Sequence, residues 1–267
     1  MIRALRLLSL YVRVSVQNLA AYRFDLIVRT IMSFVHISAE LVGIWTIFHN
    51  TTNIRGWTAW HFLVLAGVYR MVAGGIRMFI VPNVRKLMED IRNGTLDFVL
   101  LKPVNAQFLV SIREFVVWRL TDVLLGLAVS LYGCWRLTHT IPLQTVGLFF
   151  IMMIAACIIL YSLWLCLGTL CFWFVRIDNI EMVFWNVFEA GRYPTVIYPY
   201  WVRGMLTYVI PLAFITTIPA GTLIGDDQSL VLGKLAPLYA FGVAAISLVG
   251  ATWFFNFGIR RYSGASA

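Results

Sequence analysis

The chain has 267 residues, of which 61% are hydrophobic and only 12% are charged. Ordinary soluble domains are about half apolar, so this composition excludes a soluble protein. It predicts an all-α membrane protein whose single transmembrane domain covers residues 1–267. The 21 Lys and Arg residues outnumber the 12 Asp and Glu residues. A membrane protein carries such an excess mainly on its cytoplasmic loops, and we therefore expect no nucleic-acid partner.

The amino-terminal segment, residues 1–24, predicts an amphipathic helix. At about 100° per residue, Leu5 and Leu8 share one stripe, while Arg3 and Arg6 lie on the opposite side. A helix of this kind lies along the membrane surface with its apolar side toward the acyl chains. Membrane lipid is therefore an expected partner of this segment.

Six apolar stretches along the chain are candidates for transmembrane helices. A helical span needs about 20 predominantly apolar residues. The connection between the second and third stretches, residues 83–107, is polar and charged and is predicted to lie in the cytoplasm. The six predicted spans are 26–48, 58–82, 115–135, 146–174, 204–225 and 235–259.

The distribution of basic residues predicts that both termini lie in the cytoplasm. With this orientation the inner connections hold most of the Arg and Lys residues, whereas the outer ones hold few, such as Arg55 and Lys234. Cytoplasmic loops are enriched in these residues. A seventh span at 180–200 would move Arg260 to the outer side, so we expect an interfacial helix within residues 176–203.

Two opposite charges, Glu40 in the first span and Arg70 in the second, lie at similar depth from the outer side. Ionisable groups inside a membrane are costly and are often functional. The sequence leaves two interpretations open for Glu40 and Arg70, an ion pair between packed helices or the lining of a polar cavity.

Four more charges within the predicted spans have structural interpretations. Arg29 and Arg77 are expected to extend toward the inner headgroups, with their aliphatic stems in the apolar layer. Arg119 and Asp122 are three residues apart, which favours a local ion pair along one helix face.

Catalytic, cofactor and metal sites are not predicted. The four histidines show no HExxH spacing, and the four cysteines lie in apolar runs without paired CxxC spacings. The sequence also contains no GxSxG motif. A phosphate-binding loop is missing, because Leu235 follows Lys234 where Ser or Thr would be required. We therefore expect the chain not to hydrolyse nucleotide by itself.

The segment 83–107 begins with a stretch of helical character and mixed charge. Gly94 can end this helix in a left-handed cap. The apolar residues 96–101 follow, next to Lys102 and Pro103. A short inward-facing helix with an apolar flank would suit docking to a cytoplasmic partner, and the alternative is an ordinary helical loop that rests on the membrane.

Four prolines, Pro194, Pro199, Pro211 and Pro219, mark the segment that contains the fifth predicted span. Proline frees backbone carbonyls in a membrane helix and produces kinks or broken helices. We predict helix kinks at Pro211 and Pro219, and a broken or re-entrant segment between the fifth and sixth spans.

A set of short motifs in a fixed order resembles permease subunits of bacterial ATP-binding-cassette (ABC) exporters of the ABC-2 type. The similarity spans nearly the whole chain, and its specificity lies in order and spacing. The motifs are Asn93-Gly94-Thr95-Leu96-Asp97 with Leu100-Leu101-Lys102-Pro103, then Phe172-Trp173-Phe174, Tyr193-Pro194, Ile197-Tyr198-Pro199, Ile210-Pro211 and Ile218-Pro219-Ala220.

The resemblance implies a permease dimer, homodimeric or heterodimeric, in the bacterial cytoplasmic (inner) membrane. Each half docks a separate ABC ATPase subunit, which holds ATP and Mg. It also implies outward transport by alternating access of an amphiphilic, lipid-like or other small molecule. The coupling helix corresponds to about Val84–Gly94, and the expected coupling residues are Arg85, Glu89, Arg92 and Asn93, with Gly94 and Asp97 shaping its end.

Two other classes of function are compatible with such a composition. A membrane-embedded enzyme would need a cluster of His, Asp or Glu ligands or a nucleophile with its base, and the sequence shows none. A non-transporting assembly or regulatory protein would share the topology but would be purified without a bound ATPase.

Overall fold

The computed structural model describes residues 11, 17, 23–138, 142–174, 179–225 and 235–262. These residues are almost entirely helical, and the isolated bridge between Ile54 and Trp57 is the only extended pairing among them. The amphipathic helix predicted for residues 1–24 lies almost wholly outside the described residues. The prediction of a helical membrane protein is confirmed for the part that is described.

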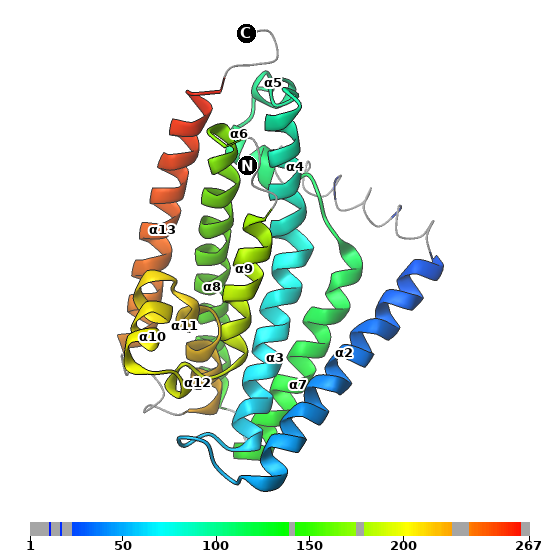
Figure 1. Ribbon diagram of the computed structural model, residues 1–267, viewed down its shortest axis with the longest axis vertical. Helices are drawn as coiled ribbons and strands as arrows, with labels where there is room; N and C mark the ends of the chain where they lie inside the picture. Colours follow the sequence, from blue (N-terminus) through cyan, green and yellow to red (C-terminus); the bar gives the residue numbers. More distant parts are fainter. Residues whose placement is uncertain are drawn as a thin grey trace.

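Five helices in the described residues are long and apolar enough to cross a membrane, rather than the six predicted. Most of them run side by side along the long axis of the molecule, while α2 crosses them obliquely (Figure 1). The five are α2 (Arg23–Asn50), a continuous helix made of α3 (Ala59–Gly75), a π-helical turn (Ile76–Ile80) and α4 (Val81–Arg92), then α7 (Leu120–Thr138) with the preceding turn Val117–Arg119, α8 (Leu143–Thr169) with the following turn Leu170–Phe172, and α13 (Ala236–Ile259).

The second of these helices runs through Pro82 and continues to Arg92, whereas the sequence placed the end of the span at Pro82. Proline lacks the N–H that would donate to the carbonyl four residues earlier, here that of Met78. The π-helical turn accommodates this disruption, and the N–H of Val116 donates to the Met78 carbonyl at 3.0 Å. The segment predicted to be cytoplasmic therefore begins as an extension of the span.

Small residues let α3 and α7 approach closely. A Cβ added at Gly126 of α7 would lie 2.6 Å from the carbonyl oxygen of Gly67 in α3, and a Cβ at Gly67 would lie 2.5 Å from the backbone nitrogen of Ser130. Interfaces of this kind are common between membrane helices, because small residues bring the backbones into van der Waals contact. The contact holds Arg70 of α3 beside α7.

Residues 180–189 form α9 (Ile180–Glu189), which runs alongside α3 and α8 (Figure 1). Phe188 is buried and stacks on Tyr69 of α3, with ring centroids 5.0 Å apart, and Phe184 contacts Trp164 of α8 at 4.6 Å. The sequence predicted an interfacial helix here. The structure differs because these aromatic side chains pack into the bundle.

The predicted fifth span, 204–225, is divided into short pieces. The chain leaves the helical conformation at Ile210, just before Pro211, and again at Thr216. Pro219 lies in the first turn of α12, where a missing N–H removes no intrahelical hydrogen bond. The pieces are α10 (Tyr200–Gly204), a π-helical turn (Met205–Val209), α11 (Leu212–Ile215) and α12 (Thr217–Ile224), preceded by the turns Ala190–Arg192 and Thr195–Ile197.

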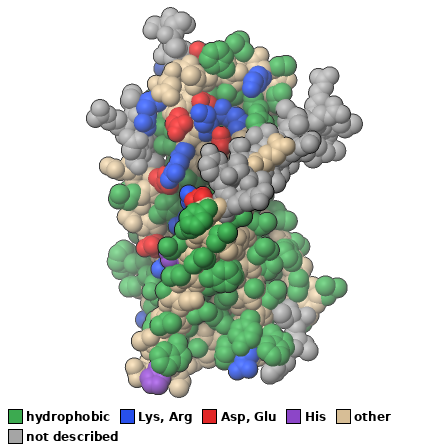
Figure 2. Space-filling view, turned by 90° about the vertical axis from the view of Figure 1, so that its right-hand side faces the viewer, with side chains coloured by type: hydrophobic (Ala, Val, Ile, Leu, Met, Phe, Trp, Pro, Cys, Tyr) green, Lys and Arg blue, Asp and Glu red, His purple; other side chains and the backbone are tan. Residues whose placement is uncertain are grey.

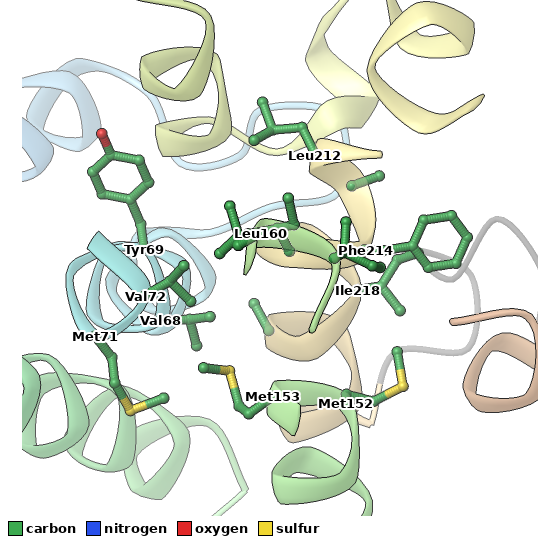
Figure 3. Close-up of a cluster of buried hydrophobic side chains, with 14 of the residues drawn as sticks. Val68, Tyr69, Met71, Val72, Met152, Met153, Leu160, Leu212, Phe214 and Ile218 are labelled. Atoms are coloured by element: carbon green, nitrogen blue, oxygen red, sulfur yellow. The ribbon is translucent and has the colours of Figure 1, made fainter. Parts of the chain in front are cut away.

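The hydrophobic core lies between α3, α8 and these short helices. Figure 3 shows Val72 of α3 facing Leu160 of α8, with Ile218 of α12 beyond it. These side chains are at most 3% exposed. Tyr69 points away from this group (Figure 3), toward the cavity described below.

The end of the molecule beyond α4 is formed by two short helices, α5 (Asp97–Leu100) and α6 (Ala106–Ser111). Leu96 and Val99 are buried in a small hydrophobic cluster together with Phe255 of α13. The side chain of Asn105 caps α6 by accepting from the N–H of Phe108 at 3.0 Å. This end therefore has a core of its own, on which α5 rests.

Candidate functional site

A cavity of about 530 Å³ lies between α2, α3, α7 and the end of α9. Figure 2 shows basic and acidic side chains gathered along one edge of the α2 side of the molecule, mainly in its upper half, beside a mostly hydrophobic surface. The charged residues that line the cavity are Glu40, Arg70, Arg77, Arg119, Asp122, Glu189 and Arg192.

Arg70 is the centre of an ion-pair network in this cavity. Its guanidinium lies 3.6 Å from the carboxylate of Glu40 and 3.2 Å from that of Asp122, and it donates to the carbonyl of Ser33 at 2.7 Å. Asp122 also pairs with Arg119 at 2.9 Å. The structure thus brings Glu40 and Arg70 together, and they both pair and line a cavity. The contact between Asp122 and Arg70 was not predicted, because spacing along the sequence indicates only the local partner, Arg119.

Two other arginines of the cavity contact aromatic rings. Arg77 lies over the ring of Trp185 at 4.3 Å, and Arg192 lies 5.5 Å from the ring centroid of Tyr69. Sequence reasoning missed Trp185, Glu189 and Arg192 as lining residues, because their segment was placed at the membrane surface. Their alternation of charged and aromatic types within a mixed segment is the signal that could have found them.

Arg29 lies outside this cavity. It pairs with Asp25 one turn earlier at 2.5 Å, and its guanidinium lies 4.9 Å from the ring of Trp118. Both side chains of the Arg29–Asp25 pair are about half exposed. This placement suits the predicted extension of Arg29 toward the membrane surface.

The end of α4 carries the residues predicted to couple the chain to an ATPase. Asn93 caps α4, and Gly94 has φ +71°, a left-handed conformation that glycine adopts without strain. Asp97 begins α5, and on the outer side of this helix Phe98 and Leu101 are 70% and 81% exposed. A pair of large apolar side chains is therefore presented at this end.

Arg85 of α4 forms a two-point ion pair with Glu181 at the start of α9, with N–O distances of 2.7 and 2.6 Å. Burial raises the pKa of Glu181, but the hydrogen bonds from Arg85 and Trp185 outweigh this effect and hold the pKa below its ordinary value. The side chain of Arg85 is thus engaged within the chain. Glu89 lies 3.5 Å from Lys86, and Arg92 is exposed at the end of α4.

The described residues contain no group of three or more His, Cys, Asp or Glu side chains that could hold a metal ion. The four cysteines form no disulfide among the described residues, and Cys134 and Cys171 are buried. The charged groups of the cavity are ion pairs and cation–aromatic contacts, which suit binding and helix positioning.

The described residues form a bundle with five helices of membrane-spanning length and a charged cavity between helices, as in a multi-pass membrane protein. The chain matches the family model described as ABC-2 family transporter protein over residues 34–266, and it belongs to this family. No curated protein and no solved structure matches it. The resemblance found in the sequence is thereby confirmed.

Family membership establishes the chain as a permease subunit of an ABC transporter and a multi-pass membrane protein. Permeases of this family are membrane components and are normally not catalytic. Membership also implies association with an ABC ATPase subunit.

Proposed function

We propose that this permease exports an amphiphilic, lipid-like or other small molecule by alternating access, driven by separate ATPase subunits that hold ATP and Mg. The observation that carries the proposal is the end of α4. The continuous helix Ala59–Arg92 has 34 residues, or about 50 Å at 1.5 Å per residue, whereas the hydrocarbon layer is about 30 Å thick. The excess length suits an end of α4 that extends outside the membrane.

Phe98 and Leu101, just beyond the end of α4, form the proposed docking surface for the ATPase. Phe98 lies on α5 and Leu101 directly follows this helix, and both are far more exposed than the neighbouring Leu96 and Val99. Exposed apolar residues outside the lipid layer favour a protein partner. The proposed coupling residues precede this surface along the chain: Arg85, Glu89 and Arg92 lie on α4, Asn93 caps it, and Gly94 and Asp97 lead into α5.

The proposed complex contains two permease copies, identical or paralogous, in the bacterial cytoplasmic membrane. Its α5 end faces the cytoplasm together with both termini. This orientation is supported by the basic residues Arg85, Lys86, Arg92 and Lys102 at that end, because cytoplasmic segments are enriched in Lys and Arg. The proposal treats residues 1–267 as one transmembrane domain.

Co-purification with the ATPase tests this function. We expect the wild-type chain to retain an ATPase through detergent extraction and the Phe98→Asp/Leu101→Asp variant to lose most of it, since a charge in the centre of an apolar contact is left desolvated. The matched control is Leu143→Asp, because Leu143 is 86% exposed at the opposite end of the bundle.

Transport assays in vesicles complete the test. The substrate is first identified by mass spectrometry of the co-purified complex. We then expect nucleotide-dependent movement of this substrate out of the cytoplasmic compartment. A chain that is purified without any ATPase and performs its role in the cell would instead be a non-transporting assembly protein.

A further inference from the structure

The charges of the cavity do not balance within it. Glu40 forms an ion pair with Arg70, and Asp122 forms ion pairs with Arg70 and Arg119. The ion pairs among the described residues include neither Arg77 nor Arg192. Their close contacts are with aromatic rings, while Arg192 attracts Glu40, and Arg77 attracts Glu181, at longer range.

Glu189 is the remaining carboxylate of the lining, and the ion pairs of the described residues do not include it. The cavity therefore offers two arginines outside ion pairs against one such carboxylate. Arginine binds carboxylate, phosphate and sulfate oxygens through charge-assisted hydrogen bonds. Its guanidinium is also less strongly hydrated than the ammonium group of lysine. The uncompensated charge favours an anionic ligand.

The cavity also has a polarity gradient. Ile44 and Ile47 line its end next to Phe62, Arg192 lies beside Tyr69 near its middle, and Arg77 lies at its other end. Phe62 and Arg77 are 15 residues apart on one continuous helix, which corresponds to about 22 Å along its axis. This length accommodates a head group together with a substantial part of an alkyl chain.

The cavity reaches the surface of the bundle on the α9 side. Tyr193 is 45% exposed, and Arg77, Glu189 and Arg192 are also exposed. The cavity is also bordered by α2 and α3, two helices of membrane-spanning length, so we expect a ligand to enter it from the lipid layer.

We propose that this cavity binds an amphiphile with an acidic head group, held by Arg77 and Arg192, with its alkyl chain along Ile44, Ile47 and Phe62. This inference rests on the proposed export function and specifies the substrate class of the same permease. Arg70, Glu40 and Asp122 keep α2, α3 and α7 in register around the ligand.

The binding test uses the purified full-length permease in a neutral maltoside detergent. Dodecyl phosphate is titrated, with dodecyltrimethylammonium and inorganic phosphate as comparison ligands, and the midpoint of thermal unfolding is measured. We expect dodecyl phosphate to raise the midpoint in a saturable manner. We expect the Arg77→Gln and Arg192→Gln variants each to weaken its apparent affinity by about tenfold or more, since each removes charge-assisted hydrogen bonds.

Arg136→Gln is the matched control. Arg136 also lies over an aromatic ring, that of Trp60 at 4.6 Å, but it does not line the cavity, so its loss should leave the affinity unchanged. Arg77→Lys, which keeps the charge, should retain more affinity than Arg77→Gln. Neither Arg77 nor Arg192 forms an ion pair among the described residues, so their variants leave no carboxylate unpaired and should fold.

The outcomes separate this inference from the proposed function. Equal stabilisation by the cationic amphiphile, or by inorganic phosphate alone, would overturn the assignment of an acidic amphiphile. The same holds if Arg136→Gln weakens binding as much as Arg77→Gln does. The titration needs no ATPase, so a permease that binds dodecyl phosphate but retains no ATPase contradicts the export mechanism and leaves the binding site in place.

Discussion

At the scale of single residues, Arg70 carries more contacts between helices than any other charge described above. It joins the backbone of α2 at Ser33, the carboxylate of Glu40 and that of Asp122 in α7. Its side chain is 12% exposed and that of Asp122 is 8% exposed, so both charges depend on their partners for compensation. Removal of one partner from a buried pair leaves an uncompensated charge.

The Arg70→Gln substitution should therefore lower the free energy of unfolding by about 3 kcal/mol. The measurement is a denaturation titration in mixed micelles, followed by circular dichroism. Lys86→Gln is the control. Lys86 pairs with the exposed Glu89 and lies 3.8 Å from Asp90, which keeps Arg113 as a closer partner at 2.6 Å, so the loss should stay below about 1 kcal/mol. If the two variants lose the same amount, the network contributes nothing beyond a surface pair.

At the scale of elements, the contact between α3 and α7 determines where the cavity walls stand. Gly67 and Gly126 bring the two backbones so close that a methyl group on either does not fit. The hydrophobic effect does not favour helix association in lipid, so packing of this kind is a main source of affinity between spans.

Gly126→Ala should destabilise the protein by about 1–3 kcal/mol or more, which is typical of overpacking. Gly147→Ala is the matched control in α8, where the added Cβ has no atom within 4 Å, and it should be neutral or slightly stabilising because alanine favours the helix. Thermal unfolding monitored by size-exclusion chromatography with fluorescence detection measures both. Equal midpoints for the two variants would contradict the close contact.

At the scale of the whole molecule, α9 connects the α4 end with the cavity. Its first turn is tied to α4 through Glu181 and Arg85, and the following turns place Trp185 and Glu189 in the cavity lining. We therefore expect a displacement of α4 to reach the cavity wall through this one short helix. Arg85 is one of the predicted coupling residues, and its contact with Glu181 links it to the bundle.

Reversal of this charge pair tests the connection. Arg85→Glu should lower substrate-stimulated ATPase activity of the reconstituted complex by about fivefold or more, in the range of coupling energies between sites. The double variant Arg85→Glu/Glu181→Arg restores the attraction and should recover most of the activity. A double variant that is folded and binds the ATPase, but stays as inactive as the single one, would show that the pair does not transmit the motion.

The sequence predicted those features that depend on long apolar runs. The five long helices overlap the predicted spans 26–48, 58–82, 115–135, 146–174 and 235–259, because burial in lipid requires length and apolarity whatever the tertiary contacts. Pro82 was read as an end of a helix, and its effect was offset by Val116, a partner more than 30 residues away. Such a contact leaves no local signal.

The candidate site was predicted only in part, for a similar reason. Glu40 and Arg70 could be paired from their depth, since the two spans are adjacent in sequence and antiparallel. Glu189 and Arg192 come from a segment whose position is decided by the packing of Phe184 and Phe188 on other helices. The coupling role of the α4–α5 segment stays a prediction.

Because α2 crosses the bundle obliquely, the thickness of the bilayer affects the width of the cavity. With 28 residues, α2 is about 42 Å long, so it fits a layer of about 30 Å only by leaning. Arg70 holds the part of α2 from Ser33 to Glu40 in place, while few residues elsewhere on α2 are buried. We expect a thicker membrane to decrease the tilt of α2 and a thinner one to increase it, with the contacts of Arg70 as the fixed point. Lipid chain length would then change the width of the cavity beside Arg70.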